Sequence, residues 1–360
     1  MTLNRHEATR LANECLPLLH QSTSLPTNNL HITEKNITVQ TQCRLWAGMG
    51  YIYNISIGKT GEQQRHHIIV KRILPPPKER QSFGDKRKAD SYECEANFYE
   101  NVARDLIARH DLCIPTPYYI ERSDEGEITI CMSRLTGRSG RLASTGERHA
   151  VLLWMAKLHS ATWGSKAEEL VEGKGLQPIG SYWHLDTRPD EHDSMPRRGW
   201  EGRLKKAARA IDERLKRDRM QCCIHGDAKD ANMLFFENEK GEVCVGMYDF
   251  QYCGKAPPSV DLAYFLCVAV GETECNDHLL RFYHEQLLQR LPDDEMKPSF
   301  RELQDSVALA FCDFQRFMSG WGNWGCDLTD IVNQTLLRLD GGKELRSEDE
   351  YREAMLREFG

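Results

Sequence analysis

The residues best suited to chemistry lie in one short segment, Ile224-His225-Gly226-Asp227-Ala228-Lys229-Asp230-Ala231-Asn232. The carboxylate of Asp227 and the amide of Asn232 stand five residues apart, and a second carboxylate, Asp249, follows seventeen positions after Asn232, beyond a β turn. Such oxygens can hold a divalent metal on phosphate groups while the first carboxylate receives a hydroxyl proton. The pattern therefore predicts phosphoryl transfer, with Asp227 as the base and Asn232 and Asp249 as metal ligands, although the same residue types also occur in ordinary surface turns.

The first third of the chain has the patterns of strands around one helix. Alternating apolar residues predict a small antiparallel sheet over 37–74, and residues 128–132 return to strand character. Helical spacing is expected over 1–20, before a loop, and again over 92–106. The charged stretch 75–88 has too few apolar residues to pack, so we expect a mobile loop there.

The second half is dominated by helical spacing. One short β unit, expected over 233–236 and 243–247, lies inside it, next to the residues that carry the chemistry. The predicted fold class is therefore α+β, with a small sheet lobe and a larger, mainly helical lobe. The expected parts are an N-terminal helix and loop (1–34), a nucleotide-binding lobe (35–135) and a helical lobe with the catalytic loop and the acceptor pocket (136–360).

Composition excludes several classes of protein. The chain has 360 residues, of which 40% are hydrophobic and 28% charged, so it is not disordered as a whole. Its net charge of −7 provides no positive field for nucleic acid, and its longest apolar run, 262–270, is far shorter than the ~20 residues of a membrane span. Thirteen cysteines without a Cys-x-x-Cys pair, and no secretion signal, favour the cytoplasm. No obligate protein partner is evident.

The catalytic segment resembles the superfamily of aminoglycoside phosphotransferases, choline kinases and ecdysteroid-kinase-like (CHK kinase-like) proteins, which use His-Gly-Asp-x-x-x-x-Asn and a later Asp. The likeness covers about 35–325 and includes Leu158-His159-Ser160-Ala161-Thr162-Trp163 and Val260-Asp261-Leu262-Ala263-Tyr264-Phe265. It implies a bilobal protein-kinase-like fold, ATP and Mg²⁺ as cofactors, and a small-molecule alcohol as substrate. It also implies that Asp261 and His225 support the catalytic loop.

The resemblance extends to residues that would bind the nucleotide phosphates. Lys71 ends a predicted strand and Glu95 lies in the next predicted helix, which matches the family's phosphate-binding Lys and its Glu partner; Glu93 is the alternative partner. Gly48 and Gly50 precede a strand. Their backbone N–H groups would be able to approach phosphates, but two glycines are equally consistent with a plain turn.

The segment between the expected lobes would bind adenine. By the resemblance, backbone groups of Met132, Ser133 and Leu135 would contact the base, although Arg134 stands where the family often has an acidic residue. Lys229, two residues after Asp227, would either touch the transferring phosphate or face solvent.

Two aromatic regions are candidates for the acceptor pocket. Trp183 and Asp186 lie in one of them, and Asp313, Trp321 and Trp324 lie in the other. Aromatic faces beside carboxylates suit a neutral or cationic alcohol with an apolar or planar body, whereas a tryptophan near a helix end is more often part of the core.

Three other classes of protein share parts of this pattern. Only eleven residues separate Asp249 from Asp261 and no Ala-Pro-Glu follows, so there is no room for the activation segment of a protein kinase. A choline or ethanolamine kinase is the closest alternative among enzymes. A pseudokinase that binds nucleotide without turnover is the alternative of a different class, which the presence of Lys71, Asp227 and Asn232 together with Asp249 disfavours.

Overall fold

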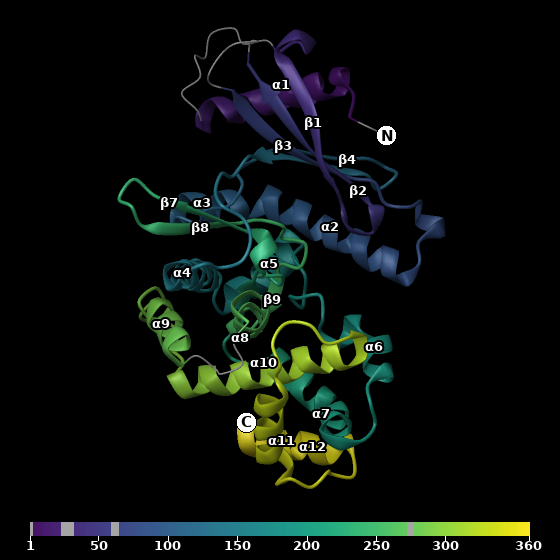
Figure 1. Cartoon of the computed structure of the whole chain (residues 1–360), viewed down its shortest axis with the longest axis vertical. Helices are drawn as coiled ribbons and strands as arrows, with labels where there is room; N and C mark the ends of the chain where they lie inside the picture. Colours follow the sequence, from purple (N-terminus) through teal and green to yellow (C-terminus); the bar gives the residue numbers. More distant parts are fainter. Residues whose placement is uncertain (1–2, 23–31, 59–64, 272–276) are drawn as a thin grey trace. The chain divides into compact units, whose positions relative to one another are not determined.

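A computed structural model describes residues 3–22, 32–58, 65–271 and 277–360 (Figure 1). The chain divides into two compact units: the first contains Met1–Ile107 and Ile114–Thr136, and the second contains Ala108–Cys113 and Gly137–Gly360. The first unit is built on a sheet and the second is mainly helical. The predicted α+β fold class, with a sheet lobe and a helical lobe, is confirmed.

The first unit contains a five-stranded antiparallel sheet with the strand order β1-β2-β3-β5-β4. Its strands are β1 (Ile37–Arg44), β2 (Gly50–Ile57), β3 (His66–Ile73), β4 (Pro117–Arg122) and β5 (Ile128–Ser133). Short 3₁₀ turns lie at Glu34–Asn36, Trp46–Gly48 and Lys78–Arg80. The strands predicted over 37–74 and 128–132 are confirmed, whereas β4 was not predicted.

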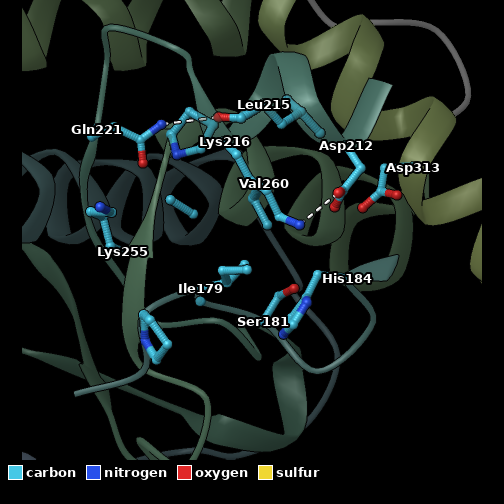
Figure 2. Close-up of a pocket in the computed structure, with 14 residues that line it drawn as sticks. Ile179, Ser181, His184, Asp212, Leu215, Lys216, Gln221, Lys255, Val260 and Asp313 are labelled. Atoms are coloured by element: carbon cyan, nitrogen blue, oxygen red, sulfur yellow. Dashed lines mark hydrogen bonds and ion pairs between the residues drawn. The ribbon is translucent and has the colours of Figure 1, made fainter. Parts of the chain in front are cut away.

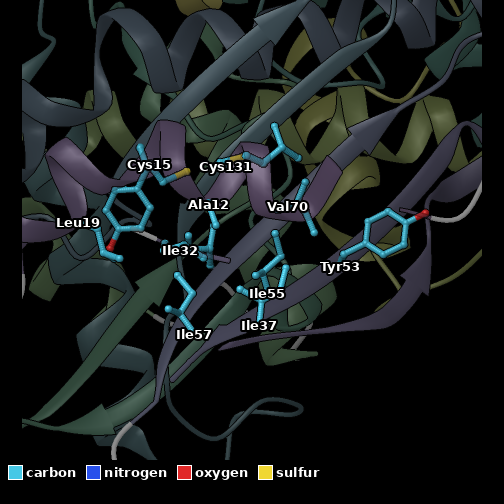
Figure 3. Close-up of a cluster of buried hydrophobic side chains, with 14 of the residues drawn as sticks. Ala12, Cys15, Leu19, Ile32, Ile37, Tyr53, Ile55, Ile57, Val70 and Cys131 are labelled. Carbon is cyan, nitrogen blue, oxygen red and sulfur yellow. The ribbon is translucent and has the colours of Figure 1, made fainter. Parts of the chain in front are cut away.

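The N-terminal helix α1 (Arg5–Ser22) packs on the sheet within this first unit. The apolar stripe predicted from its spacing is buried; its members are Ala8, Leu11, Ala12, Cys15 and Leu19. The stripe packs against buried strand residues, among them Tyr53, Ile55, Ile57, Ile68, Val70 and Cys131 (Figure 3). Because side chains alternate along a strand, Val70 lies on this face of the sheet and Lys71 on the opposite face.

The helix α2 (Phe83–Asn101) corrects one prediction. Residues 83–88, expected to be part of a mobile loop, form the first turns of this helix. Ser82 caps it, because its side chain accepts the backbone N–H of Asp85 at 3.1 Å and Asp85 binds back to the N–H of Ser82 at 3.0 Å. The charged composition therefore belongs to an exposed helix start, and α3 (Ala103–His110) follows directly.

The second unit consists mainly of helices. These are α4 (Thr145–Ala161), α5 (Ser165–Lys174), α6 (Pro189–Ser194), α7 (Gly199–Lys216), α8 (Pro258–Tyr264), α9 (Asp277–Leu288), α10 (Phe300–Trp321), α11 (Thr329–Asp340) and α12 (Glu348–Phe359). A 3₁₀ turn lies at Leu185–Thr187, and the apolar run after α8 continues as a π-helix, Phe265–Val270. Across the described parts of the chain, no helix has both the length and the apolar character that a membrane span needs.

Two small antiparallel ladders carry the catalytic segment of the second unit. The strands β7 (Met233–Glu237) and β8 (Val243–Met247) form the hairpin that the sequence predicts. The strands β6 (Cys222–Ile224) and β9 (Gly254–Ala256) form a second ladder, which was not predicted. Between β6 and β7 the chain runs through the catalytic loop and the 3₁₀ turn Asp230–Asn232.

Candidate active site

The catalytic loop is held by a buried aspartate of α8. Asp261 accepts the backbone N–H of His225 on Oδ2 at 2.8 Å and that of Gly226 on Oδ1 at 2.9 Å. The ring of His159 lies 3.3 Å from Oδ2. Burial opposes ionisation of Asp261, but these hydrogen bonds outweigh it, so its pKa lies below the usual value for an aspartate.

Gly226 occupies a position that only glycine fits. Its φ is +79°, and a Cβ would lie 2.1 Å from the carbonyl oxygen of Tyr252. The loop can therefore turn tightly against the residues that follow Asp249.

The ring of His225 ties the loop to the end of β8. Nε2 lies 3.1 Å from the carbonyl oxygen of Tyr248, which only accepts, so Nε2 carries the proton and Nδ1 accepts the N–H of Asp227 at 3.3 Å. The ring of Phe250 packs on that of His225, with 4.7 Å between the ring centres. His225 thus fixes the backbone of Asp227 beside Tyr248, the residue that precedes Asp249.

The carboxylate of Asp227 is buried, and each of its oxygens has a partner. Asn232 Nδ2 lies 3.0 Å and Lys229 Nζ lies 2.9 Å from Oδ2, while the hydroxyl of Tyr264 donates to Oδ1 at 3.0 Å. Burial raises the pKa of Asp227 against the opposing effect of Lys229. A carboxylate whose pKa is moved upward suits proton acceptance near neutral pH.

Asn232 and Asp249 have the donor atoms that Mg²⁺ requires. Nδ2 of Asn232 donates to both the carbonyl and the carboxylate oxygens of Asp227, which leaves the amide oxygen to ligate a cation. Asp249 follows β8 in the left-handed region at φ 71°, with Gln251 Nε2 2.6 Å from its Oδ1. An amide oxygen and a carboxylate fit a hard cation that keeps water and phosphate as its other ligands.

The residues expected to bind phosphates lie in the first unit. Lys71 Nζ is 2.6 Å from Oε2 of Glu95 on α2 and 5.2 Å from the centre of the Tyr92 ring, and both members of the ion pair are buried. Glu93, the alternative partner, instead pairs with Arg122 at 2.7 Å. The structure therefore joins Lys71 with Glu95.

Close packing against β3 explains why residue 50 is a glycine. Its φ is +131°, and a Cβ would lie 2.0 Å from the carbonyl oxygen of Arg72 on β3. Gly48 has φ +74° in the turn between β1 and β2, as a plain turn also requires. A phosphate contact at either glycine stays a prediction.

The residues expected to contact adenine lie on and after β5. Met132 is buried and pairs with Ile69 of β3. Ser133 donates its N–H to the carbonyl oxygen of Thr116 at 2.9 Å, so that group is used within the unit. Leu135, half-buried, follows the strand. Their contact with adenine stays a prediction.

The three tryptophans predicted for the acceptor pocket belong to one aromatic cluster of the second unit. Trp183 is 1% exposed and stacks on Tyr264 with 4.7 Å between ring centres. Trp324 is half-buried and meets Tyr264 edge-on at 6.0 Å. Trp321 is 60% exposed and stacks on Phe317. The cluster is linked to the catalytic loop, because the hydroxyl of Tyr264 donates to Asp227.

The two carboxylates predicted beside these tryptophans have cationic partners. Asp186 pairs with Lys216 at 2.8 Å, and Asp313 pairs with Arg316 at 2.8 Å. A guanidinium, that of Arg188, also lies over the Trp321 ring at 5.4 Å. The charges around the aromatic cluster are therefore largely compensated within the protein.

Asp313 also lines a cavity of about 160 Å³ between α7, α8 and the segment 178–184 (Figure 2). Asp212 also lines the cavity, and its carboxylate forms an ion pair with Lys216, as Figure 2 shows. The described residues that line this cavity do not include Asp227 or Asn232. It is thus separate from the catalytic loop.

Comparison with known proteins identifies the family. A sequence profile described as the phosphotransferase enzyme family (APH) matches residues 62–295, more than half of the chain. The chain belongs to this family of phosphotransferases. The resemblance inferred from the catalytic segment is thereby confirmed. Among curated protein sequences, none matches the chain.

Solved structures share the fold at low sequence identity. A choline kinase from Cryptosporidium parvum Iowa II has a TM-score of 0.51 and 10% identity, over 95% of this chain and 96% of the kinase. The aminoglycoside phosphotransferase APH(2")-IIIa, in complex with GDP and kanamycin, has a TM-score of 0.50 and 13% identity, over 95% of this chain and all of that one. At such identities the likeness concerns the fold alone.

Sequence reasoning assigned no role to three residues of this phosphotransferase that contact the site. Tyr264 donates to Asp227, His159 lies against Asp261, and Arg188 lies over Trp321. Tyr264 had a usable signal, because it follows Asp261 by three positions and so lies on the same side of its helix. Arg188 had none, since its position depends on tertiary packing.

Proposed function

We propose that this phosphotransferase is an ATP-dependent small-molecule kinase that transfers the γ-phosphoryl group to a hydroxyl. The observation that supports the proposal most is the arrangement around Asp227: a buried carboxylate held by Asn232 and Lys229 and tied through His225 to the strand that leads to Asp249. Family membership supplies the reaction class.

Each residue then has a distinct task. Asp227 receives the proton of the acceptor hydroxyl, and its raised pKa favours that task near neutral pH. Lys71, oriented by Glu95, contributes positive charge to the phosphates. Bound Mg²⁺, held by Asn232 and Asp249, would supply further charge neutralisation. Asp261 keeps the loop in place through its two backbone hydrogen bonds.

The aromatic cluster supports an acceptor with a sizeable apolar or planar body. The half-buried ring of Trp324 meets Tyr264, whose hydroxyl binds Asp227, and the exposed ring of Trp321 belongs to the same cluster. Asp186 and Asp313 are already paired with Lys216 and Arg316. The proposed acceptor is therefore recognised mainly by contact of its apolar or planar body with the aromatic rings, and less by attraction of a positive charge.

The decisive experiment is a transfer assay with γ-labelled ATP, Mg²⁺ and a fractionated metabolite extract. We expect label to appear in a low-molecular-weight acceptor, and Asp227→Asn to lower the rate about 10²–10⁴-fold with little change in ATP affinity. Asp230→Asn is the matched control, because it removes a carboxylate from the same loop without touching Asp227, and it should stay active.

Other outcomes separate the alternatives. Nucleotide binding without transfer to any fraction would indicate a pseudokinase. Label found only in phosphocholine or phosphoethanolamine would indicate a choline or ethanolamine kinase. A parallel assay with γ-labelled GTP determines the nucleotide preference, and full activity of Asp227→Asn would refute the assignment of the base.

A further inference from the structure

The two carboxylate oxygens of Asp227 are in different situations. Oδ2 lies within hydrogen-bond distance of Asn232 Nδ2, at 3.0 Å, and of Lys229 Nζ, at 2.9 Å. Oδ1 accepts one hydrogen bond, from the hydroxyl of Tyr264 at 3.0 Å. Since a carboxylate oxygen has two lone pairs, Oδ2 has both engaged and Oδ1 retains the capacity for one more hydrogen bond. Oδ1 is therefore the better placed oxygen to take up a proton.

The direction of the hydrogen bonds around Tyr264 follows from counting hydrogens. An ionised carboxylate only accepts, so the single hydroxyl hydrogen of Tyr264 goes to Asp227. The hydroxyl of Tyr182 lies 3.1 Å from that of Tyr264 and must then donate to it. The result is an ordered chain from Tyr182 through Tyr264 to Oδ1, in which each bond polarises the next.

The ring of Tyr264 is held on several sides. Trp183 stacks on it at 4.7 Å with an angle of 23° between the rings, and Phe314 meets it edge-on at 5.3 Å. Tyr264 is completely buried and ends α8, the helix that also carries Asp261. One short helix thus holds both the backbone of the catalytic loop and the carboxylate of its aspartate.

We infer that Tyr264 is a positioning residue for the proposed base: its hydroxyl fixes the orientation of the Asp227 carboxylate, so that Oδ1 takes the proton of the acceptor hydroxyl. The inference rests on the proposed function. In the transfer step the acceptor oxygen loses its proton to Oδ1 and forms a bond to the γ-phosphorus. The bond from that phosphorus to the β–γ bridging oxygen breaks, and ADP leaves with the bond's electron pair.

Tyr264→Phe removes the hydroxyl and keeps the ring that packs against Trp183. The carboxylate of Asp227 then keeps its donors on Oδ2 and loses the one that fixes Oδ1. The variant therefore tests the orientation of the base without removing the base.

The matched control is Tyr351→Phe. Tyr351 is also completely buried and donates to a carboxylate of the same unit, Oδ2 of Asp340, at 2.9 Å. Both variants lose the same kind of hydrogen bond and should show a similar fall in melting temperature. Only Tyr264→Phe should lower kcat.

In the transfer assay with the metabolite fraction that accepts label, Tyr264→Phe should lower kcat about 10–100-fold, as expected for loss of one hydrogen bond to a charged group. The KM for ATP should stay the same. Tyr182→Phe should act in the same direction but more weakly, because its hydroxyl reaches Asp227 only through Tyr264.

The outcomes distinguish this inference from the proposed function. A wild-type kcat in Tyr264→Phe overturns the positioning role, as does an equal loss of kcat in Tyr351→Phe, while an inactive Asp227→Asn still supports the kinase. A fully active Asp227→Asn refutes the base itself. A kcat that falls in Tyr264→Phe but not in Tyr351→Phe, with the KM for ATP unchanged, supports both.

Discussion

Nζ of Lys71 lies 2.6 Å from Oε2 of Glu95, although neither side chain exposes more than 4% of its surface. A buried ion pair contributes little net stability, but removal of one partner leaves the other charge without compensation in a low-dielectric environment. The pair is therefore a sensitive place to test how the first unit would bind phosphates.

We expect Lys71→Met and Glu95→Gln each to cost about 3–5 kcal/mol of unfolding free energy, and the double variant to cost clearly less than the sum. The losses in kcat/KM should be non-additive as well, because Glu95 acts only by orienting Lys71. Urea unfolding and transfer kinetics of the three variants measure both effects.

Glu93→Gln is the matched control for this cycle. It makes the same change two residues earlier on α2, where Glu93 pairs with the partly exposed Arg122, and should cost about 0–1 kcal/mol without affecting transfer. Additive losses for Lys71 and Glu95 would contradict the coupling.

The backbone at Asp249 determines which variant tests its role. Its φ of 71° strains alanine, whereas asparagine adopts this region readily, so Asp249→Asn removes the charge and keeps the turn. We expect it to abolish most of the rise in melting temperature that Mg-ATP gives the wild type. A ligand that binds the folded state stabilises it, and this stabilisation falls as the dissociation constant rises.

Asp111→Asn serves as the control for that experiment. Asp111 is also in the left-handed region, at φ 49°, and its exposed carboxylate pairs with Lys157 at 2.8 Å. The control should keep the full Mg-ATP shift. A full shift in Asp249→Asn would contradict a metal role for this carboxylate.

Local patterns in the sequence predicted most of the first unit. The alternation of residue types along β2 and the spacing of Ala8, Leu11 and Cys15 in α1 depend only on neighbouring residues, and the structure confirms the strand and the buried stripe of the helix. The error at residues 83–88 came from weighing apolar content alone, since the Ser82 and Asp85 capping pattern already marks a helix start. The strands β6 and β9 are too short to produce a pattern.

The catalytic loop was recognisable because His225, Gly226, Asp227 and Asn232 occupy the fixed positions of the pattern His-Gly-Asp-x-x-x-x-Asn. The partners of those residues were not, because Tyr264 and Asp227 stand 37 positions apart and meet only through the packing of α8. The pairing of Asp313 with Arg316 was also missed, although the spacing of three residues on one helix allows it.

Asp212, which lines the cavity of the second unit, makes the free energy of unfolding depend on pH. Burial, together with the nearby Asp313, raises the pKa of Asp212 to about 6 in spite of its ion pair with Lys216. Between about pH 4 and pH 6 the folded state therefore holds a proton that the unfolded state has lost, so this group lowers stability as pH rises, by up to about 3 kcal/mol. Asp212→Asn should remove this slope from unfolding curves measured between pH 4 and pH 7.

Asp186→Asn is the matched control, because Asp186 binds the same Lys216 but is exposed. Its hydrogen bond to Lys216 holds its pKa below the usual value. Its stabilising effect is thus present above about pH 4 and lost only as the solution becomes more acidic. The slope between pH 4 and pH 7 should survive in Asp186→Asn, and an unchanged slope in Asp212→Asn would contradict the raised pKa.

Substitution of each of the three tryptophans of the aromatic cluster should affect a different property. Trp183→Ala empties a fully packed position and should cost about 3–5 kcal/mol of unfolding free energy. Trp321→Ala removes an exposed ring and its cation–π contact with Arg188, which is worth only about 0.5–1 kcal/mol. Trp324→Ala should raise the acceptor KM most, because its ring meets Tyr264, which binds Asp227. The KM for ATP in the same variants is the internal reference and should not change. If Trp321→Ala and Trp324→Ala leave the acceptor KM at its wild-type value, these rings only pack against the protein, and the acceptor binds elsewhere.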